Sequence, residues 1–222
     1  MKTILLILIA FILTSTSCHK KKYCQRNYIF ENPTSIYPIQ ASYNIGDTLW
    51  YELDFTNDIK DVTTGEIIKL ENFDFMRNVI HLSKLHDSTT SVLGQYTNSG
   101  GDFDYIVEKG QIVDKYSSGP EYKLAYYDNS YHLKIGIIMK ASGRFSSRIV
   151  FENNITSHHI SSAIIVKGEC EEEYLETIEH PMNRQSDGTY QNNYNIYSEF
   201  MNISLENDPN YIKQQSFFFI VN

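Results

Sequence analysis

The sequence predicts an all-β protein whose antiparallel strands form a sandwich or a barrel. After residue 36, apolar and polar residues alternate with a period of two along most of the chain. This is the pattern of strands that bury one face. Between residues 89 and 151, turn residues recur at the short spacing that separates the strands of stacked antiparallel hairpins. We therefore expect a folded domain over residues 37–222.

The N-terminus has the layout of an export signal. Lys2 gives it a positive start, Ile4–Leu13 is an unbroken apolar run, and a stretch of small residues leads to Cys18. As a helix the apolar run is about 15 Å long, which is half of the ~30 Å hydrocarbon core and too short to span it. Residues 1–17 are therefore predicted to be a cleaved signal peptide.

Residues 18–36 are predicted to be an irregular tether between the signal and the folded domain. His19 and three lysines at positions 20–22 come directly after Cys18. Each lysine near an anionic leaflet contributes about 1 kcal/mol of attraction. This segment is therefore expected to lie against lipid headgroups.

Three strands are predicted in the first part of the domain. The clearest is Leu49–Phe55, in which every second residue is apolar and the residues between them are Trp50, Glu52 and Asp54. This alternation predicts one buried face and one mostly polar face. The other two extended segments are Glu66–Leu70 and Asn72–Leu85.

Five strands are predicted in the middle of the chain, between turns rich in glycine, serine and asparagine. The strand Tyr131–Met139 has the strongest pattern, because its apolar residues alternate with His132, Lys134 and Gly136. Together the five strands predict a meander of antiparallel hairpins. They are Phe103–Glu108, Gln111–Tyr116, Tyr122–Tyr127, Tyr131–Met139 and Phe145–Phe151.

The last third of the chain has a weaker pattern. Ile160–Val166 is a predicted strand, and Lys167–Ile178 fits either a helix or a long strand, with its glycine and its Thr-Ile end favouring the strand. Tyr190–Leu205 is predicted to be extended. Gln215–Val221 contains four consecutive large apolar residues, so we expect a closing strand that is covered on both faces. An exposed segment of this kind would be prone to aggregation.

Residues 15–18, Ser-Thr-Ser-Cys, resemble the lipobox of bacterial lipoproteins, in the looser form seen in Bacteroidetes. The resemblance implies that cleavage leaves Cys18 as the first residue and that this cysteine is acylated. Several acyl chains, at ~0.8 kcal/mol per buried CH₂, give a durable anchor. The alternative is an ordinary signal peptide cut nearby, which would leave Cys18 as a free thiol in an oxidising compartment.

The residues that follow Cys18 indicate in which membrane the protein would be anchored. By analogy with the sorting rule of enterobacterial lipoproteins, His19 in place of aspartate implies the outer membrane. Surface-export signals of Bacteroidetes tend to carry acidic residues here, whereas this chain carries lysines. The resemblance therefore implies an outer-membrane lipoprotein that faces the periplasm, with surface exposure as the alternative.

Three cysteines are present, at positions 18, 24 and 170. If Cys18 carries the lipid, Cys24 and Cys170 remain as the natural disulfide pair in a compartment that permits disulfides. A bond that closes so long a loop stabilises a fold by about 4–5 kcal/mol by the chain-entropy argument. It would also hold the folded domain close to the bilayer, because Cys24 follows the anchor so closely.

Three short elements resemble lipoproteins of Bacteroidetes that carry an immunoglobulin-like β-sandwich module. The first is a Gly-Asp-Thr turn that leads into an apolar strand, within Tyr43–Trp50. The others are the Asp-x-x-x-Gly-Glu element at Asp61–Glu66 and the Asn-Phe-x-Phe element at Asn72–Phe75. The resemblance implies an antiparallel immunoglobulin-like sandwich with extra hairpins, and it implies no chemistry.

Composition and motifs argue against several functions. The chain has 27 acidic and 19 basic residues, and a formal net charge of −8. Nucleic-acid binding is not expected, because no basic stripe could neutralise phosphates. No nucleophile elbow, zinc-binding helix, P-loop or dinucleotide fingerprint occurs in the sequence. We therefore expect no catalytic residue, no metal site and no cofactor.

Trp50 is the one candidate ligand-binding residue. It is the only tryptophan, and the alternation of its strand turns it away from the apolar residues on either side. An outward tryptophan can stack on a sugar or anchor a protein partner. The favoured alternative is that a second layer of the fold covers this face.

These features predict a non-catalytic, lipid-anchored envelope protein that binds a protein or the envelope polymer. The first alternative is a carbohydrate-binding accessory lipoprotein of a glycan-uptake system, and the second is an envelope hydrolase. An exposed aromatic platform that includes Trp50 would favour the sugar binder. A flat apolar patch would favour a protein partner, and a concave pocket of histidines and carboxylates would favour an enzyme.

Overall fold

The computed structural model describes residues 25–31, 34–73, 75, 78–85, 96–151, 172–179, 181–201 and 214–222. These residues lie mostly in β-strands, with little helix, so the predicted all-β class is confirmed. The strands form two large sheets, here called sheet I and sheet II, and two small two-stranded pairs.

Sheet I runs in the order β12–β13–β4–β2, and β9 also pairs with β13. Its described pairings are all antiparallel, and the longest joins β13 to β4, where Leu133 lies opposite Leu53. Its strands are β2 (Ser35–Tyr37), β4 (Thr48–Thr56), β9 (Phe103–Lys109), β12 (Ala125–Tyr127) and β13 (Ser130–Met139).

Sheet II runs in the order β10–β11–β7–β14–β16–β3, and β8 also pairs with β7. The last strand in the chain, β16, is an interior strand of this sheet, antiparallel to β14 and parallel to β3. A 3-10 turn, η1 (Gly100–Asp102), precedes β9. The strands of sheet II are β3 (Ser42–Tyr43), β7 (Asn78–Leu85), β8 (Tyr96–Asn98), β10 (Gln111–Tyr116), β11 (Gly119–Lys123), β14 (Gly143–Phe151) and β16 (Ser216–Val221).

The apolar faces of the two sheets meet in the main hydrophobic core. The alternation in β4 works as predicted, because Leu49, Tyr51 and Leu53 are at most 1 % exposed while the residues between them face outward. Sheet II contributes Phe217 and Phe219, which are fully buried. The hydroxyl groups of Tyr51 and Ser147 form a hydrogen bond across this core, so β4 and β14 are linked by a polar contact as well as by packing.

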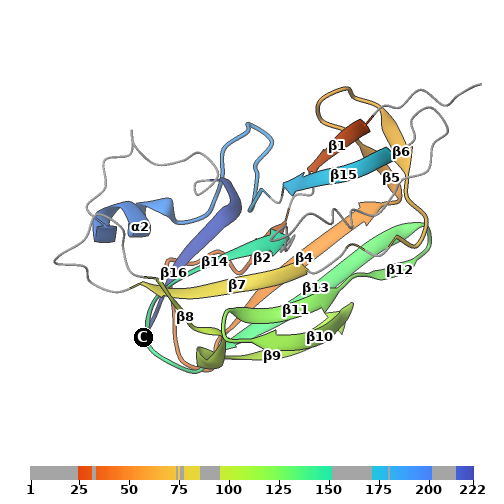
Figure 1. The fold of residues 1–222 in the computed structure, drawn as a ribbon. Coiled ribbons are helices and arrows are strands. Elements are labelled where there is room, and N and C mark those ends of the chain that lie inside the picture. Colours follow the sequence, from red (N-terminus) through yellow and green to blue (C-terminus); the bar gives the residue numbers. More distant parts are fainter. Residues whose placement is uncertain are drawn as a thin grey trace, which may run out of the picture.

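A second apolar cluster, here called the end cluster, lies beside one end of sheet I. Its side chains include residues of β1 (Gln25–Glu31), β5 (Asp58–Lys60) and β6 (Ile67–Lys69). β5 pairs with β6, and β1 pairs with β15 (Glu172–Glu179). Figure 1 shows these four strands grouped at one end of the molecule. Phe30 of β1 contacts Phe55 of β4 with ring centroids 5.2 Å apart, and this contact joins the end cluster to sheet I.

Helix α2 (Tyr194–Met201) covers the outer side of β16, at the far end of the molecule from the end cluster (Figure 1). Tyr197 stacks on Phe218 at 4.7 Å between centroids, and Phe218 is 1 % exposed. Because Phe217 and Phe219 point into the main core, β16 is covered on both faces. The prediction of a closing strand covered on both faces is confirmed.

The prediction that Tyr190–Leu205 is extended is wrong, because α2 lies within it. Two features favour the helix. Tyr194 and Tyr197 are three residues apart, so on a helix they share a face, and both pack on Phe218. At the start of the helix, the side-chain oxygen of Asn192 accepts a hydrogen bond from the backbone N–H of Tyr194 at 3.3 Å, in the manner of a helix cap.

Two further predictions about strands need correction. The segment Tyr122–Tyr127 is not one strand, because the chain passes at Leu124 from β11 in sheet II to β12 in sheet I. The strand predicted within Asn72–Leu85 is confirmed as β7 (Asn78–Leu85), and Asn72 has a left-handed backbone conformation with φ +47°. The sheets are also not wholly antiparallel, since the pairs β1–β15 and β3–β16 are parallel.

Residues 18–36 are not irregular throughout, because they contain all of β1 and the start of β2. Strand β1 pairs with β15 from Gln25 opposite Glu172 to Glu31 opposite Glu179. The strand interpretation of Lys167–Ile178 is confirmed from Glu172 onward. Several predictions fall outside the described residues: the signal peptide (1–17), Cys18, Cys24, Cys170 and the strand over 160–166.

Candidate functional site

The outer face of sheet I, which points away from the main core, carries the most chemically varied described surface. The register of its strands places Tyr37 opposite Trp50, Trp50 opposite Gly136, and Gly136 opposite Ile106. These four residues form a row across β2, β4, β13 and β9, here called the aromatic row. Trp50 is half-buried, and Ile106 is 42 % exposed.

Gly136 makes room for the indole of Trp50. A Cβ atom at this position would lie 3.0 Å from two carbons of the Trp50 ring and 2.9 Å from the methyl carbon of Thr48. Such distances are too short for ordinary carbon contacts. The absence of a side chain on Gly136 therefore lets the indole lie across β13, where a large aromatic group covers a glycine on the neighbouring strand.

Lys134 lies next to the aromatic row. Its ammonium nitrogen is 5.0 Å from the centre of the Trp50 ring and 6.0 Å from that of Tyr37, both within the range of cation–π attraction. The same nitrogen lies 2.6 Å from a carboxylate oxygen of Glu108. The hydrogen bond to Glu108 is the main reason that the pKa of Lys134 is raised, so Lys134 remains a cation on this face at neutral pH.

Glu52 connects the aromatic row to a second lysine. Its carboxylate accepts a hydrogen bond of 2.9 Å from the hydroxyl of Tyr37 and lies 3.7 Å from the ammonium of Lys109. Burial, followed by this hydrogen bond, raises the pKa of Tyr37, so its hydroxyl stays protonated. Positive and negative groups therefore alternate beside the aromatic rings.

His132 stands at the end of this face nearest to β12. Its ring stacks on Tyr127 with centroids 4.0 Å apart and planes inclined by 15°. Its Nδ1 lies 3.1 Å from a carboxylate oxygen of Asp54, but neither ring nitrogen makes a hydrogen bond of acceptable geometry. Stacking on Tyr127, rather than a hydrogen bond, is therefore the contact that fixes the imidazole.

This arrangement offers flat aromatic surface and many hydrogen-bonding groups within a short distance. Hydroxyl-rich ligands need both, because their C–H faces pack on rings while their hydroxyls exchange hydrogen bonds with charged groups. In the part of the chain that the structure describes, no three His, Cys, Asp or Glu side chains gather where they could hold a metal ion.

Trp50 points outward as its sequence position predicts, and the described contacts to its ring come from its own sheet, through Gly136 and Lys134. A covering second layer is thus not seen among the described residues. Sequence reasoning missed three neighbours of Trp50, namely Tyr37, Lys134 and Gly136. The alternation in β13 marked Lys134 and Gly136 as outward-facing, but only the cross-strand register brings them to Trp50.

No protein-family model matches the chain, and no curated protein matches it at a significant level. Among the residues that the structure describes, no helix combines the length and the apolar character needed to cross a bilayer.

Proposed function

We propose that this chain is a non-catalytic, lipid-anchored protein of a bacterial cell envelope, which acts by binding a partner through the outer face of sheet I. The aromatic row is the observation that carries this proposal, because Trp50 and Tyr37 lie beside alternating charges on one face of sheet I. Two facing sheets are compatible with the immunoglobulin-like sandwich that we propose for the domain. The anchor on Cys18 would place this face close to the envelope polymers.

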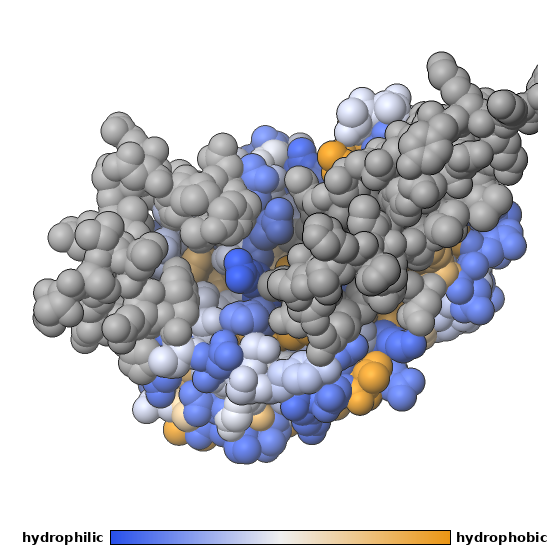
Figure 2. Space-filling model, viewed as in Figure 1, coloured by the Kyte–Doolittle hydropathy of each residue, from blue (hydrophilic) through white to orange (hydrophobic). Residues whose placement is uncertain are grey.

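A glycan is the partner that this face favours, as in an accessory lipoprotein of glycan uptake. Sugar rings stack on aromatic side chains, and their hydroxyls can both donate to Glu52 and accept from Lys134. A protein partner is the other candidate, but in the view of Figure 2 the described surface is mainly hydrophilic, with apolar residues in small separate groups.

The single tryptophan allows a direct test, because all indole fluorescence of the protein comes from Trp50. Titration with soluble peptidoglycan fragments and with plant and host oligosaccharides is expected to give a saturable change in emission for one of these glycans. Calorimetry is then expected to show that Trp50→Ala weakens this binding by about tenfold or more, as for other central aromatic anchors.

Val62→Ala is a matched control, because Val62 is 48 % exposed and belongs to the β5–β6 hairpin rather than to sheet I. This variant is expected to bind the glycan as the parent protein does. Glycan binding that is unchanged by Trp50→Ala, or emission that responds to none of the glycans, would contradict the sugar-binding proposal.

The anchor has its own test. Cells that express the protein and are fed a clickable fatty acid are expected to label it, and the protein is expected to sediment with membranes. Cys18→Ala should remove the label and prevent sedimentation, because acylation needs the thiol. Cys170→Ser should keep the label, because the lipid is not on Cys170. An unlabelled parent protein that comes out in aqueous extracts would refute the anchor.

A further inference from the structure

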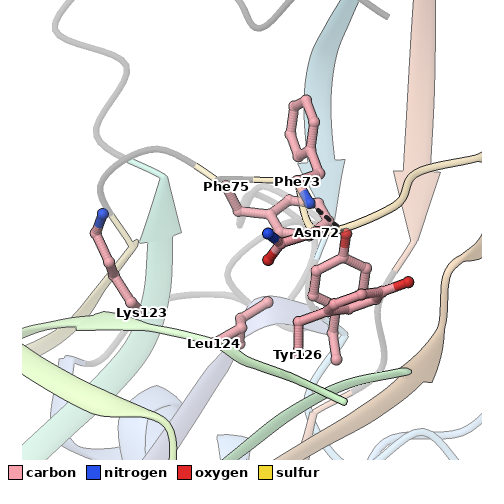
Figure 3. Close-up of a pocket in the computed structure, with 7 residues that line it drawn as sticks. Asn72, Phe73, Phe75, Lys123, Leu124 and Tyr126 are labelled. Atoms are coloured by element: carbon pink, nitrogen blue, oxygen red, sulfur yellow. Dashed lines mark hydrogen bonds between the residues drawn. The ribbon is translucent and has the colours of Figure 1, made fainter. Parts of the chain in front are cut away.

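A cavity of about 300 Å³ opens between the segment after β6 and the β11–β12 connection, away from the outer face of sheet I. Figure 3 shows Lys123 on one side of it and Asn72, Phe73 and Phe75 on the other. Leu124 and the rings of two tyrosines complete the lining, which consists of Asn72, Phe73, Phe75, Lys123, Leu124, Tyr126 and Tyr131.

The wall of the cavity is held in place by hydrogen bonds and ring contacts. The hydroxyl of Tyr131 donates to the carbonyl of Leu70 at 2.8 Å and accepts from the backbone N–H of Phe73 at 2.6 Å. Burial raises the pKa of this tyrosine to about 12, so the hydroxyl keeps its proton. Phe75 meets both Phe73 and Tyr131 edge to face, with centroids 4.9 Å apart in each pair. The hollow is therefore preformed.

The cavity has apolar walls that the fold leaves incompletely covered. Phe73, Leu124 and Tyr126 are half-buried, although their neighbours Phe75 and Tyr131 are at most 5 % exposed. A volume of about 300 Å³ is at the lower end of the range for small-molecule sites. An aromatic ligand suits this cavity, because the lining rings already pack edge to face on one another. The exposed ring surface of the half-buried residues could contact one further ring in the same way.

The charges at the rim indicate which aromatic ligand fits. Lys123 is the only lining residue with a formal charge. The adjacent acidic residues have partners, since Glu71 lies 3.0 Å from the ammonium of Lys69 and Glu121 accepts from the hydroxyl of Tyr116 at 2.7 Å. Lys123 already has an interaction within the protein, but an ammonium has three donors and can hold a carboxylate as well.

We propose that this cavity binds a small aromatic carboxylate, with its ring between Phe73, Leu124 and Tyr126 and its carboxylate at Lys123. The amide of Asn72 is exposed at the rim and can donate to the same carboxylate. The negative net charge of the chain does not oppose this, because charges beyond about 8 Å are largely screened at physiological ionic strength. This proposal does not depend on the proposed glycan site.

The test compares two probes with the same ring and opposite charge, phenylacetate and phenethylamine, by NMR titration of the intact protein. Phenylacetate is expected to bind saturably and more tightly than phenethylamine. Lys123→Met should weaken phenylacetate binding by about threefold to fivefold, as expected for a partly exposed ion pair. Phe73→Ala should weaken both probes by about tenfold, because the ring contact is lost.

Two controls complete the design. Lys140→Met removes a positive charge nine residues along the chain from Tyr131, about 30 Å away along β13, and should leave both affinities unchanged. Leu124→Phe should fill the hollow and abolish phenylacetate binding while thermal unfolding stays close to that of the parent. Equal binding of the two probes, an effect of Lys140→Met equal to that of Lys123→Met, or no saturable binding of phenylacetate would overturn the proposal.

Discussion

Gly119→Ala is expected to destabilise the protein by about 4 kcal/mol or more, which is among the largest effects of a single substitution. Gly119 begins β11 and has φ +136°, a conformation that residues with a side chain rarely adopt. A Cβ atom here would lie 2.0 Å from the backbone oxygen of Ile80. That oxygen belongs to β7, which is paired on both sides in sheet II, so it cannot move away without disrupting the sheet.

Denaturant unfolding followed by Trp50 emission measures this effect. Gly101→Ala is the matched control, because Gly101 lies in η1 and a Cβ atom there would meet nothing within 4 Å. It is expected to change the free energy of unfolding by less than about 0.5 kcal/mol. If the two alanine variants unfolded at the same denaturant concentration, the close approach of β11 to β7 would be wrong.

Loss of a Cys24–Cys170 disulfide is expected to lower the free energy of unfolding by about 4–5 kcal/mol, from the chain entropy of the loop that it closes. Both cysteines lie outside the described residues, but their neighbours support the pair. The parallel ladder of β1 and β15 begins with Gln25 opposite Glu172, which are one and two positions after the cysteines. A bond there would fix the open end of a pair that contributes Tyr28 and Phe30 to the end cluster.

Unfolding midpoints with and without a thiol reductant give the measurement, and the double variant Cys24→Ser with Cys170→Ser gives the control. The parent protein should lose stability on reduction, to the level of the double variant, whereas the double variant should not respond to reductant. Free thiols at both positions, found by mass spectrometry of unreduced peptides, would exclude the bond.

Local alternation was sufficient to predict the strands that bury one face. The predicted limits of β4, β13 and β14 agree with the structure to within two residues, because apolar and polar residues alternate along each of them. The limits of β10 were predicted from the turns on either side of it. The split between β11 and β12 had no such signal. Residues on both sides of Leu124 are extended, and only the identity of the neighbouring strand changes.

Helix α2 was not predicted from the sequence. Its tyrosines and isoleucine favour strands in isolation, and the asparagines around them weaken any helical pattern. The helix forms because Tyr194 and Tyr197 cover Phe218, a residue of a strand that comes later in the chain. Tertiary packing of this kind cannot be predicted from a window of one segment.

Only part of the candidate site was predictable, because its residues meet through pairing between separate strands. The outward direction of Trp50 follows from the pattern of β4 alone. Its association with Lys134 and Gly136 depends on the register between β4 and β13, and Tyr37 ends a strand, β2, that was not predicted from the sequence. Cross-strand register is set by the whole sheet, so the identity of the aromatic row came only from the structure.

The interior position of β16 determines how early during synthesis the chain can complete its fold. Residues 216–221 are translated after every other described strand, yet they lie between β14 and β3. A nascent chain that stops short of them leaves β14 with a bare edge and leaves a gap in the core where Phe217 and Phe219 belong. Completion of sheet II and of the main core therefore has to wait until residues 216–221 have been synthesised.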